Sequence, residues 1–474
     1  MKYFPIVQQT NKSLYNNDSE IFIEKFISDA HHIEVQVVGD GNGNVVTIGE
    51  RECSIQRRNQ KVIEETPSPF LNNETRKRLF EDSIKLASYL KYKSVGTIEF
   101  LFDHITKDYY FLEINTRLQV EHTITESTFS VDIVEIMIKI SIYNDFKIIS
   151  ERSLNQKGHS IEVRVCAEDP LNKFTPSFGR ISYVNFKESD SIRVDTWIEN
   201  DSFVSPLYDS LLCKAISHGD TREEAITILI DWLENSTIQG ISTNISFLSS
   251  ILKSETFRSG NTLTKFLNTF SYQSYSCNVI EAGMFSLIVD FPGRVNYWNV
   301  GIPPSGPIDS RNHRIANYLV GNEENDAAIE ILLDCFVLKF FCDSVIAVTG
   351  ANCDIKIDGL IVNMFESVYI KTNSVLEIKL NSQFGCRAYL AIQGGIKTVP
   401  YLGSRSTFVA GKLGGLHGEP LRINDSLPLS KLPPKNINRK WPTEFIPKMT
   451  NEWIILALAG PHGLGILFML FIYN

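Results

Sequence analysis

The chain has 474 residues and a formal net charge of −9, with 43% hydrophobic and 21% charged residues. This length predicts two to four domains, and the composition is that of a soluble globular protein. The negative charge gives no electrostatic reason to expect nucleic acid or an anionic membrane as a partner.

The cysteines and the two ends of the chain further limit the class of protein and its cellular location. Eight cysteines are scattered without a C-x-x-C pair or a Cys/His cluster, so we expect no zinc site and a reducing, cytoplasmic location. The start of the chain resembles neither a signal peptide nor a transit peptide. The apolar stretch 465–473 is too short to span a bilayer.

The first 90 residues predict a mixed pattern of strands and helices. Residues 1–30 read as a short amphipathic helix followed by a strand over 21–26. An alternating strand begins at His31 and ends at a hairpin turn over 40–44. Residues 56–61 are rich in hydrogen-bond donors, which suits a basic surface loop or a ligand-binding loop. A helix is expected over 73–92, with these residues on its inner side: Leu79, Ile84, Leu86, Ala87 and Leu90.

The most informative stretch is 95–126, where strand-like runs over 97–102 and 109–114 flank a polar turn. Glu99 and Glu113 each lie between apolar neighbours, so both carboxylates point away from the core and share a face if the runs form a hairpin. Two bare carboxylates repel each other, and a divalent cation removes that cost. With Asn115 they form an oxygen-only set that suits Mg²⁺ bridging nucleotide phosphates. The alternative is an amphipathic hairpin with a solvated, salt-bridged face.

The segments EFLFD and YYFLEINTRLQVEHTITE resemble the metal-binding core of the biotin carboxylases, a branch of the ATP-grasp enzymes. The resemblance implies that Glu99, Glu113 and Asn115 hold Mg²⁺ or Mn²⁺, and that Glu121 acts as the base on bicarbonate. It implies a bicarbonate site formed by Lys61, Arg117, Gln119, Val120 and Glu121. It implies an ATP site formed by Glu24, Lys25, Ile27, His32, Gln56, Asn59, Glu99 and Glu113. Many biotin carboxylases have histidine where Asn59 stands, so this contact cannot carry charge.

The next unit is expected to begin after an apolar helix over 129–143. The block GHSIEVRVCAEDP, followed by a Pro-Ser pair, resembles the C-terminal domain of the biotin carboxylases. This resemblance makes Arg164 the catalytic arginine that stabilises the enolate oxygen of biotin. Asp220 and Thr221 are expected to cap a helix over 220–235. A last helix is expected over 243–252, and the polar residues 269–276 read as a linker.

Residues 279–430 show a different pattern, with short strands, many Gly and Pro turns and few long helices. The blocks FPGRVNYWNVGIPPSGPIDS, IAVTGANCDIKIDG, CRAYLAIQGGI and YLGSRSTF resemble the domain named for allophanate hydrolase subunit 2. That resemblance implies a mostly-β, cyclophilin-like half of a carboxyltransferase. No catalytic constellation stands out by spacing, and we expect about half of the polar candidates to hold turns. The carboxyltransferase candidates are Asp290, Arg294, Asp309 and Arg387, beside Arg311 and Arg405.

The order of these blocks resembles the urea carboxylase and urea amidolyase family. The expected fold is therefore an α+β multidomain chain with a partial ATP-grasp domain, a biotin carboxylase C-terminal domain and a mostly-β cyclophilin-like domain. The expected divisions are 1–150 (truncated ATP-grasp), 151–270 (C-terminal domain), 271–278 (linker), 279–463 (carboxyltransferase half-domain) and 464–474 (apolar tail foreign to the family, or a buried core strand).

The resemblance implies an ATP-dependent ligase that carboxylates biotin with bicarbonate and passes the carboxyl group to urea, giving allophanate. Biotin would arrive on a carrier domain, and a second carboxyltransferase half-domain would complete an oligomeric enzyme. A lid, two ATP-binding lysines and a Rossmann-like subdomain are absent from this sequence, so we expect the chain alone not to turn over ATP. The alternatives are a truncated non-catalytic remnant, or a fragment of an acyl-CoA or pyruvate carboxylase.

Overall fold

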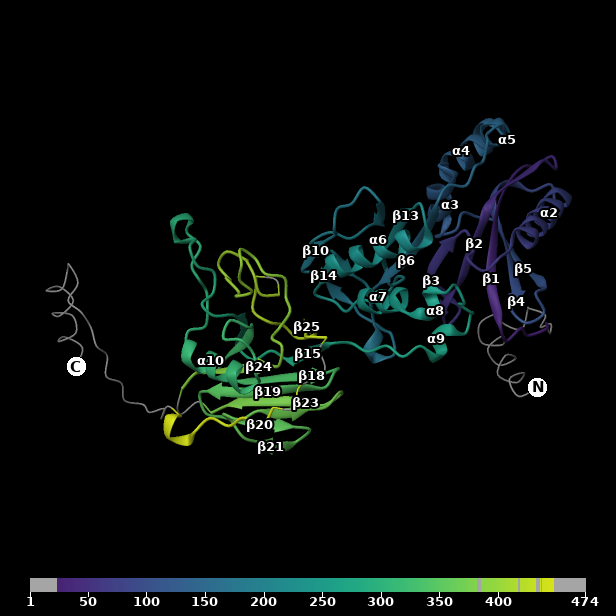
Figure 1. The fold of residues 1–474 in the computed structure, drawn as a ribbon. Coiled ribbons are helices and arrows are strands. Elements are labelled where there is room, and N and C mark those ends of the chain that lie inside the picture. The colour runs from purple at the N-terminus through teal and green to yellow at the C-terminus, as the bar shows by residue number, and fades with distance from the viewer. Residues whose placement is uncertain (1–23, 382–384, 417, 432–434, 436, 447–474) are drawn as a thin grey trace.

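The computed structural model describes residues 24–381, 385–416, 418–431, 435 and 437–446. They form two bodies, joined by residues 271–275, which have no regular secondary structure (Figure 1). The helix expected within the first 20 residues and the apolar tail lie outside the described residues. The strand expected over 21–26 is wrong for its described part, since residues 24–27 have no regular structure.

The first body is organised around one eight-stranded sheet, in the order β11-β13-β6-β3-β2-β1-β4-β5. All of its neighbouring strands are antiparallel. Its strands are β1 (Ala30–Asp40), β2 (Val45–Arg57), β3 (Gln60–Thr66), β4 (Lys93–Asp103), β5 (Tyr109–Asn115), β6 (His159–Cys166), β11 (Ile192–Thr196) and β13 (Leu211–Gly219). Short strands at its margin are β7 (Glu168–Asp169), β8 (Thr175–Pro176), β9 (Gly179–Arg180), β10 (Tyr183–Asn185), β12 (Phe203–Val204) and β14 (Thr237–Gln239).

The helices of the first body are α2 (Asn73–Tyr89), α3 (His122–Phe129), α4 (Ile133–Tyr143), α5 (Lys147–Ser150), α6 (Arg222–Asn235), α7 (Ile245–Lys253), α8 (Glu255–Arg258) and α9 (Phe266–Thr269), with a 3₁₀ turn over Pro170–Asn172. Helix α2 confirms the predicted helix and buries Leu79 and Ala87. The inward placement of Leu90 is wrong: the helix ends before it, and its side chain is 52% exposed. The helix expected over 129–143 is confirmed as α4, but it begins only at Ile133, because α3 ends at Phe129 with Ser130 in a left-handed conformation.

The two faces of the sheet differ where β1 and β4 meet. Ile33 and Val35 pack with Leu79 of α2 in an apolar cluster. Between them, Glu34 points to the opposite face because side chains alternate along a strand. That second face is buried yet polar, and it holds the candidate site.

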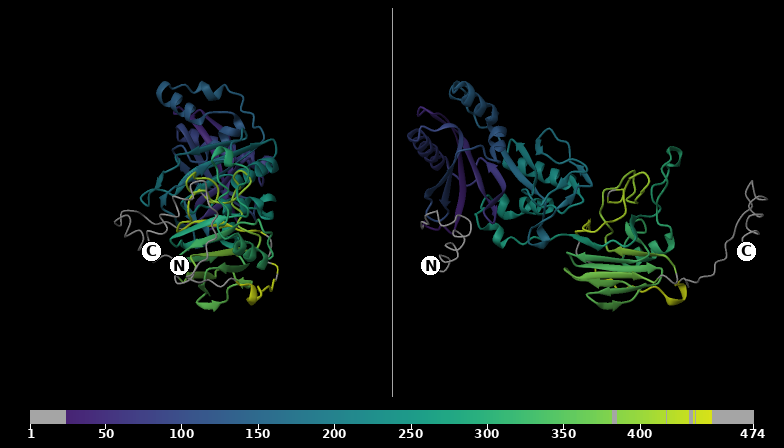
Figure 2. Two further views of the ribbon diagram at one scale, coloured as in Figure 1. Left: turned by 90° about the vertical axis from the view of Figure 1, so that its left-hand side faces the viewer. Right: turned by 180° about the vertical axis from the view of Figure 1, so that it is seen from behind.

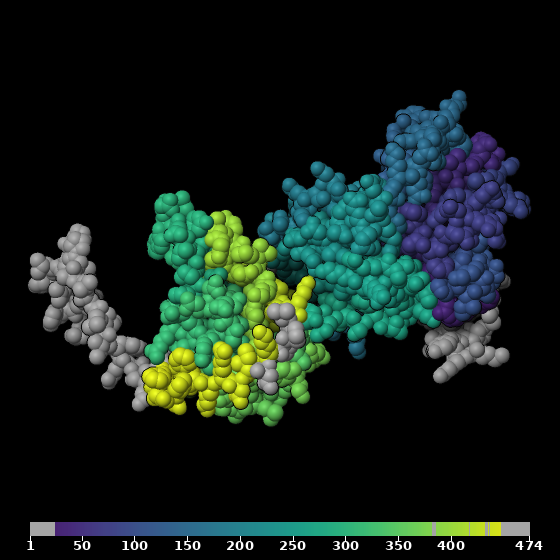
Figure 3. All heavy atoms as spheres, viewed as in Figure 1, coloured from purple at the N-terminus to yellow at the C-terminus, as the bar shows by residue number. Residues whose placement is uncertain are grey.

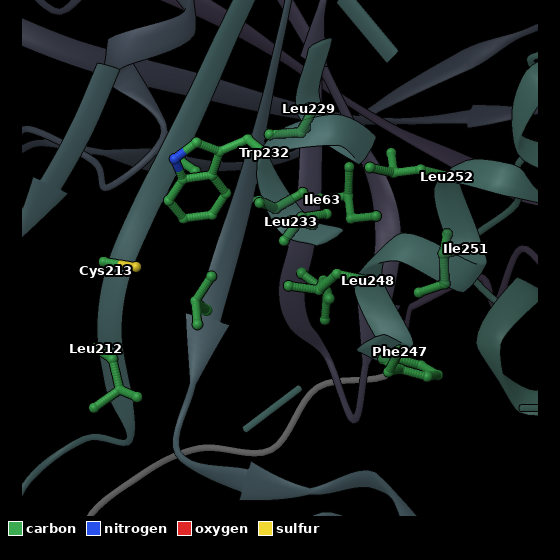
Figure 4. Packing of buried hydrophobic residues seen from close by; sticks show 14 of the residues in the cluster. Ile63, Leu212, Cys213, Leu229, Trp232, Leu233, Phe247, Leu248, Ile251 and Leu252 are labelled. Carbon is green, nitrogen blue, oxygen red and sulfur yellow. The ribbon is translucent and has the colours of Figure 1, made fainter. Parts of the chain in front are cut away.

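The core of the first body spans the expected division at residue 150. Trp232 and Leu233 of α6 belong to the same apolar cluster as Leu248 and Ile251 of α7 (Figure 4). Ile63 of β3 belongs to the same cluster, although β3 precedes residue 150 by a long stretch of chain. Strands from both sides of this division therefore share one sheet and one core.

The second body contains a six-stranded sheet, β21-β20-β23-β18-β15-β25, and a five-stranded sheet, β16-β17-β24-β19-β22. Side chains of both sheets form one apolar cluster, as in a sandwich. The strands are β15 (Ser276–Glu281), β16 (Phe285–Val289), β17 (Ala328–Leu332), β18 (Cys335–Phe340), β19 (Ser344–Gly350), β20 (Cys353–Ile357), β21 (Leu360–Val362), β22 (Val368–Ile370), β23 (Val375–Leu380), β24 (Arg387–Ile392) and β25 (Ser426–Pro428). Helix α10 (Ser310–Leu319) packs on the five-stranded sheet, and 3₁₀ turns cover Trp298–Val300 and Thr443–Phe445.

The second body is mostly β in its described part, as predicted. The expected linker over 271–278 is wrong at its end, because residues 276–278 already belong to β15. Figures 2 and 3 show the two bodies side by side with a narrow zone of contact. There the Nε2 of Gln239 donates to the carbonyl of Leu416 at 2.9 Å, and Lys431 pairs with Glu234 at 3.2 Å. Within the described residues, no helix is long and apolar enough to cross a membrane.

Candidate active site

The predicted carboxylate pair lies on one face of the β4–β5 hairpin. Glu99 stands directly opposite Glu113 in the antiparallel register. The Nδ2 of Asn115 donates to Oε1 of Glu99 at 2.8 Å and to Oε1 of Glu113 at 3.0 Å. One amide reaches both carboxylates, so the hairpin and the shared face are both confirmed.

This arrangement fits a divalent cation. Glu99 is buried and held by several partners, whereas Glu113 is exposed. The amide of Asn115 presents its nitrogen to the two acids, and a half-turn of the amide would present its oxygen instead. A hard cation with oxygen ligands could then offset both negative charges in place of the NH₂ group.

Lys61 lies at the centre of three carboxylates from distant parts of the chain. Its Nζ pairs with Glu34 of β1, with Glu99 at 3.1 Å and with Glu121 at 2.8 Å. Burial by itself lowers the pKa of Lys61, but the surrounding carboxylates outweigh it and raise this pKa well above its usual value. Lys61 is therefore a fixed cation beside Glu121.

His32 is a second cation of this cluster. Its Nε2 lies 2.8 Å from Oε2 of Glu99 and 3.4 Å from Oε1 of Glu34, and its Nδ1 lies 2.8 Å from Nε2 of Gln56. Burial opposes protonation, but hydrogen bonds to Glu34 and Glu99 raise the pKa of His32 to about 9. The same cluster lowers the pKa of Glu34 to about 2, against the effect of its complete burial, chiefly through the charge of Lys61.

Arg164 of β6 joins the second half of the first body to this cluster. Its Nε donates to Oε1 of Glu64 at 2.7 Å, and its Nη2 donates to Oε2 of Glu121 at 2.9 Å. Glu121 therefore accepts a charged hydrogen bond on each oxygen, from Lys61 on one and from Arg164 on the other. Such bonds are about twice as strong as neutral ones, so they orient the carboxylate firmly.

These residues line a cavity of about 350 Å³. Its walls include Lys61, Arg117, Gln119, Val120, Glu121, Arg164, His32, Asn59, Glu99, Glu113 and Asn115. Arg117 is exposed, and its Nη2 lies 3.4 Å from Oδ1 of Asn115, so its guanidinium is available to an anion in the cavity. The cavity thus combines the fixed cations Lys61 and Arg164, the oriented carboxylate of Glu121, and the two acids that could bind a metal ion.

Four of the residues expected to bind ATP do not line this cavity. Gln56 reaches it only through His32. Glu24 and Lys25 are exposed, and Lys25 donates from Nζ to the hydroxyl of Tyr110 at 3.2 Å; Ile27 is buried. These three precede β1 and are not in a strand.

Sequence reasoning missed a buried arginine that supports the site. Arg51 of β2 is fully buried and pairs with Glu34 at 3.2 Å. Its side chain also donates to Gln36, Thr97, Gln119 and Thr125. The alternation of polar and apolar residues in β1 and β2 could have indicated this role. A buried carboxylate such as Glu34 needs a cation beside it, and Arg51 is the arginine within these two strands that can supply it.

The carboxyltransferase candidates are separate from the cavity. Asp290 is buried and accepts from Ser404 and Ser406 and from the backbone of Arg405, which ties β16 to the 404–406 loop. Arg294 is fully buried and donates to the carbonyls of Tyr401 and Ser406.

The other two candidates are also held by local contacts. Asp309 caps α10 by accepting from the backbone of Asn312 at 3.0 Å. Arg387 donates from Nε to Glu330 at 3.2 Å, and Glu330 also accepts from the buried hydroxyl of Tyr389 at 2.7 Å. Each candidate therefore has a structural role in the described residues.

Comparison with known families agrees with this architecture. Residues 5–149 match the carbamoyl-phosphate synthase L chain ATP-binding domain, and residues 162–269 match the biotin carboxylase C-terminal domain. Residues 300–468 match the carboxyltransferase domain, subdomain A and B. The first body therefore matches biotin carboxylase-type ATP-binding and C-terminal domains, and the second matches a carboxyltransferase domain.

The chain is a homologue of the urea amidolyases and urea carboxylases over nearly its whole length. It is 43% identical over 471 residues to the urea amidolyase of Saccharomyces cerevisiae, covering 97% of this chain and 25% of the relative. It superposes on the crystal structure of the Kluyveromyces lactis urea carboxylase with a TM-score of 0.78 and 42% identity, covering 89% of this chain and 38% of that one. The mitochondrial propionyl-CoA carboxylase alpha chain of Caenorhabditis elegans is 42% identical over 281 residues, covering 59% of this chain and 38% of the relative. The chain thus spans only about a quarter to two fifths of the length of these relatives.

Proposed function

We propose that this chain is the central part of a biotin-dependent urea carboxylase. Such an enzyme uses ATP and bicarbonate to carboxylate biotin and then transfers the carboxyl group to urea, giving allophanate. The observation that carries the proposal is the position of Glu121, whose two oxygens accept from Lys61 and Arg164 at the wall of the cavity. The two cations orient this carboxylate at the cavity wall, where it could take a proton from an anion held by Lys61.

The roles of the cavity residues follow from their charges. Lys61 and Arg117 would hold bicarbonate, with Gln119 and Val120 completing its site. Glu121 would accept the proton of bicarbonate, and the oxygen that is freed would attack the terminal phosphorus of ATP. The bond from that phosphorus to the bridging oxygen would break, so that ADP leaves with this oxygen and carboxyphosphate forms. Fixed donors of this kind, aimed at developing negative charge in a site shielded from water, usually supply the largest catalytic effect.

Glu99, Glu113 and Asn115 would hold Mg²⁺, or Mn²⁺, beside the nucleotide phosphates. The cation would neutralise phosphate oxygens during transfer. His32, Gln56 and Asn59 would contact the nucleotide, and Glu24, Lys25 and Ile27 would line its base if the segment before β1 folds over it.

Biotin, when bound, accepts the carboxyl group at a ring nitrogen. Arg164 would donate to the ureido oxygen on which negative charge develops. We propose that biotin arrives on a carrier domain of the full-length enzyme. We also propose the divisions 1–150, 151–270, 279–463 and 464–474, with the linker shortened to 271–275 because β15 begins at Ser276. The mostly-β second body supports a cyclophilin-like fold for 279–463.

An exposed apolar surface supports a second carboxyltransferase half-domain as a partner. Trp298, Val300 and Ile308 belong to the loop between β16 and α10 and are 72%, 64% and 69% exposed. Apolar side chains grouped in this way mark an interaction surface. We further propose an oligomeric full-length enzyme in the cytoplasm, where its eight unpaired thiols would persist.

Similarity to the propionyl-CoA carboxylase covers 59% of the chain, whereas similarity to the urea enzymes covers 97% and so extends over both bodies. The extra coverage favours urea over an acyl-CoA or pyruvate as the acceptor. The alternative is a non-catalytic remnant, and the following experiment distinguishes the two.

A chimera tests the proposal directly. The matching quarter of the Saccharomyces cerevisiae urea amidolyase is replaced by this chain, and release of ADP is measured with bicarbonate and with urea or an acyl-CoA as acceptor. We expect urea-dependent ADP release that Glu121→Gln abolishes. A folded chimera that is inactive with every acceptor would support the remnant, and activity with acyl-CoA alone would overturn the assignment of urea.

A further inference from the structure

Two buried acids behind Arg164 form a pair that the proposed mechanism does not use. Glu64 of β3 lies directly opposite Glu162 of β6 in the antiparallel register. Both side chains are completely buried. Directly opposed residues on neighbouring strands have Cβ atoms about 4.5–5.5 Å apart and share a face of the sheet, so the two carboxyl groups are close neighbours.

The contacts of the pair leave one oxygen on each acid without a donor. Oε1 of Glu64 accepts from Arg164 at 2.7 Å, and Oε2 of Glu162 accepts from Thr123 of α3. Among the described residues, Oε2 of Glu64 and Oε1 of Glu162 have no hydrogen-bond partner. A buried carboxylate oxygen left without a donor is costly, unless a proton lies between the two acids.

The surrounding charges act unevenly on the pair. Arg164 of β6 contacts Glu64, and Lys214 of β13 lies 3.7 Å from Oε2 of Glu162. Lys61 of β3 and Glu121, which precedes α3, also act on Glu64 through their charges.

These surroundings favour the protonated form. Burial, and then the charge of the opposite acid, raise the pKa of Glu64 to about 8, although Arg164 opposes this shift. Burial likewise raises the pKa of Glu162 despite Lys214. Two like charges in a dry site cannot both ionise cheaply.

We propose that Glu64 and Glu162 share one proton at neutral pH and, as positioning residues, hold Arg164 and Lys214 behind Glu121. The catalytic meaning of this pair rests on the proposed function, because that function assigns Arg164 to biotin and Glu121 to bicarbonate. The shared proton itself does not depend on that function. With one negative charge instead of two, the pair leaves part of the positive charge of Arg164 available toward Glu121 and the cavity.

The first test measures stability of the 474-residue chain by thermal unfolding from pH 6 to pH 9. A carboxyl group whose pKa is raised on folding stabilises the protein fully below its ordinary pKa, and this contribution is lost as pH rises through the folded value. We therefore expect the Tm of the unmodified chain to fall from pH 6 toward pH 8 and to level off above it, where the folded and the unfolded chain bind the same number of protons at this pair. Glu64→Gln should remove this fall, because the Nε2 of glutamine can donate to Glu162 in place of the shared proton.

Two further variants make the test decisive. Glu64→Gln/Glu162→Gln removes the last negative charge and should lower Tm at every pH. Glu65→Gln is the matched control, since Glu65 is the next residue of β3 but pairs with Arg222 and His159; it should leave the fall above pH 7 in place. A Tm without alkaline fall in the unmodified chain, or a loss in Glu64→Gln equal to that of the double variant, would overturn the shared proton.

The second test uses the chimera and reports on the positioning role. Glu64→Gln should move the alkaline limb of the pH profile of biotin carboxylation to higher pH, and the double variant should lower kcat more than it raises the KM for ATP. An unchanged pH profile and kcat in both variants would overturn the role. If the chimera shows no carboxylation at all, the proposed function fails, whereas the stability test still decides the shared proton.

Discussion

Single side chains in this protein act through partners that lie far away in the sequence. Lys61 contacts three acids whose positions range from residue 34 to residue 121. Each of these acids would be costly to bury alone, and a buried charge is tolerated only when it is paired. Removing one member is therefore expected to disturb the others.

Glu113→Gln should weaken binding of Mn²⁺ by about tenfold or more, because it removes one of two negative ligands. The affinity of the purified chain for Mn²⁺ can be measured by titration calorimetry or by the free-ion signal in electron paramagnetic resonance. Glu135→Gln, at an exposed position of α4, is the matched control and should bind as the unmodified chain does. Equal affinity in both variants would contradict the metal site.

Glu65→Gln should cost about 3–5 kcal/mol of unfolding free energy, because it leaves Arg222 and His159 without their buried partner. Burial raises the pKa of Glu65, but His159 and Arg222 outweigh it, so this pKa is lowered. A lowered pKa stabilises the protein above the ordinary value of 4.5, and the contribution disappears as pH falls through the folded value. Urea unfolding at pH 7 and at pH 4 should therefore show a smaller pH difference in the variant than in the unmodified chain.

At the scale of elements, helix α6 shows how a local signal and a tertiary contact combine. Thr221 caps the helix by accepting from the backbone of Glu224 at 3.2 Å, as the sequence predicted. Arg222, the first residue of α6, then donates to Glu65 of β3 and to the carbonyls of Arg258 and Phe257. The cap starts the helix, and the arginine fixes it to the sheet and to α8.

Thr221→Ala should lower the unfolding free energy by about 1 kcal/mol, because the first turn loses the acceptor for its free N–H group. Thr227→Ala is a matched control on the exposed side of the same helix, where the hydroxyl only donates to the carbonyl of Glu223. This control should be neutral or slightly stabilising, since alanine is the better helix former. Urea unfolding of both variants measures the difference, and equal losses would show that the hydroxyl of Thr221 is not a cap in solution.

At the scale of the whole molecule, each body has its own core. The polar contacts between the bodies that the structure describes involve half-buried or exposed groups, such as Lys431 with Glu234. Such contacts contribute little to stability. The two bodies are therefore expected to unfold as separate units.

Calorimetry of the full chain should show two transitions. Leu248→Ala, in the core of the first body, should lower only one of them, and Leu338→Ala, in the sandwich core, only the other. Each substitution should cost about 2–5 kcal/mol in its own body, because it leaves a cavity among buried side chains. A joint shift of both transitions in either variant would show that the bodies unfold together.

The sequence predicted the hairpin and the facing carboxylates because strand alternation is a local property, readable at Glu99 and Glu113. It also predicted the cap at Thr221 and the mostly-β second body. It was wrong about element boundaries, as at Leu90, which lies beyond the end of α2, and at residues 276–278, which already belong to β15. It missed Arg51, Glu64 and Glu162, whose roles depend on which strands lie side by side.

Alternation of polar and apolar residues, together with the turn and cap residues, determined by itself which segments form strands and helices and which side chains leave the core. Only the tertiary structure decided that β3 pairs with both β2 and β6, and so brought Lys61, Glu121 and Arg164 to one cavity. The physical reason is that the pairing of distant strands depends on burial and charge compensation summed over the whole sheet. The sequence of a single segment therefore does not determine which strands pair.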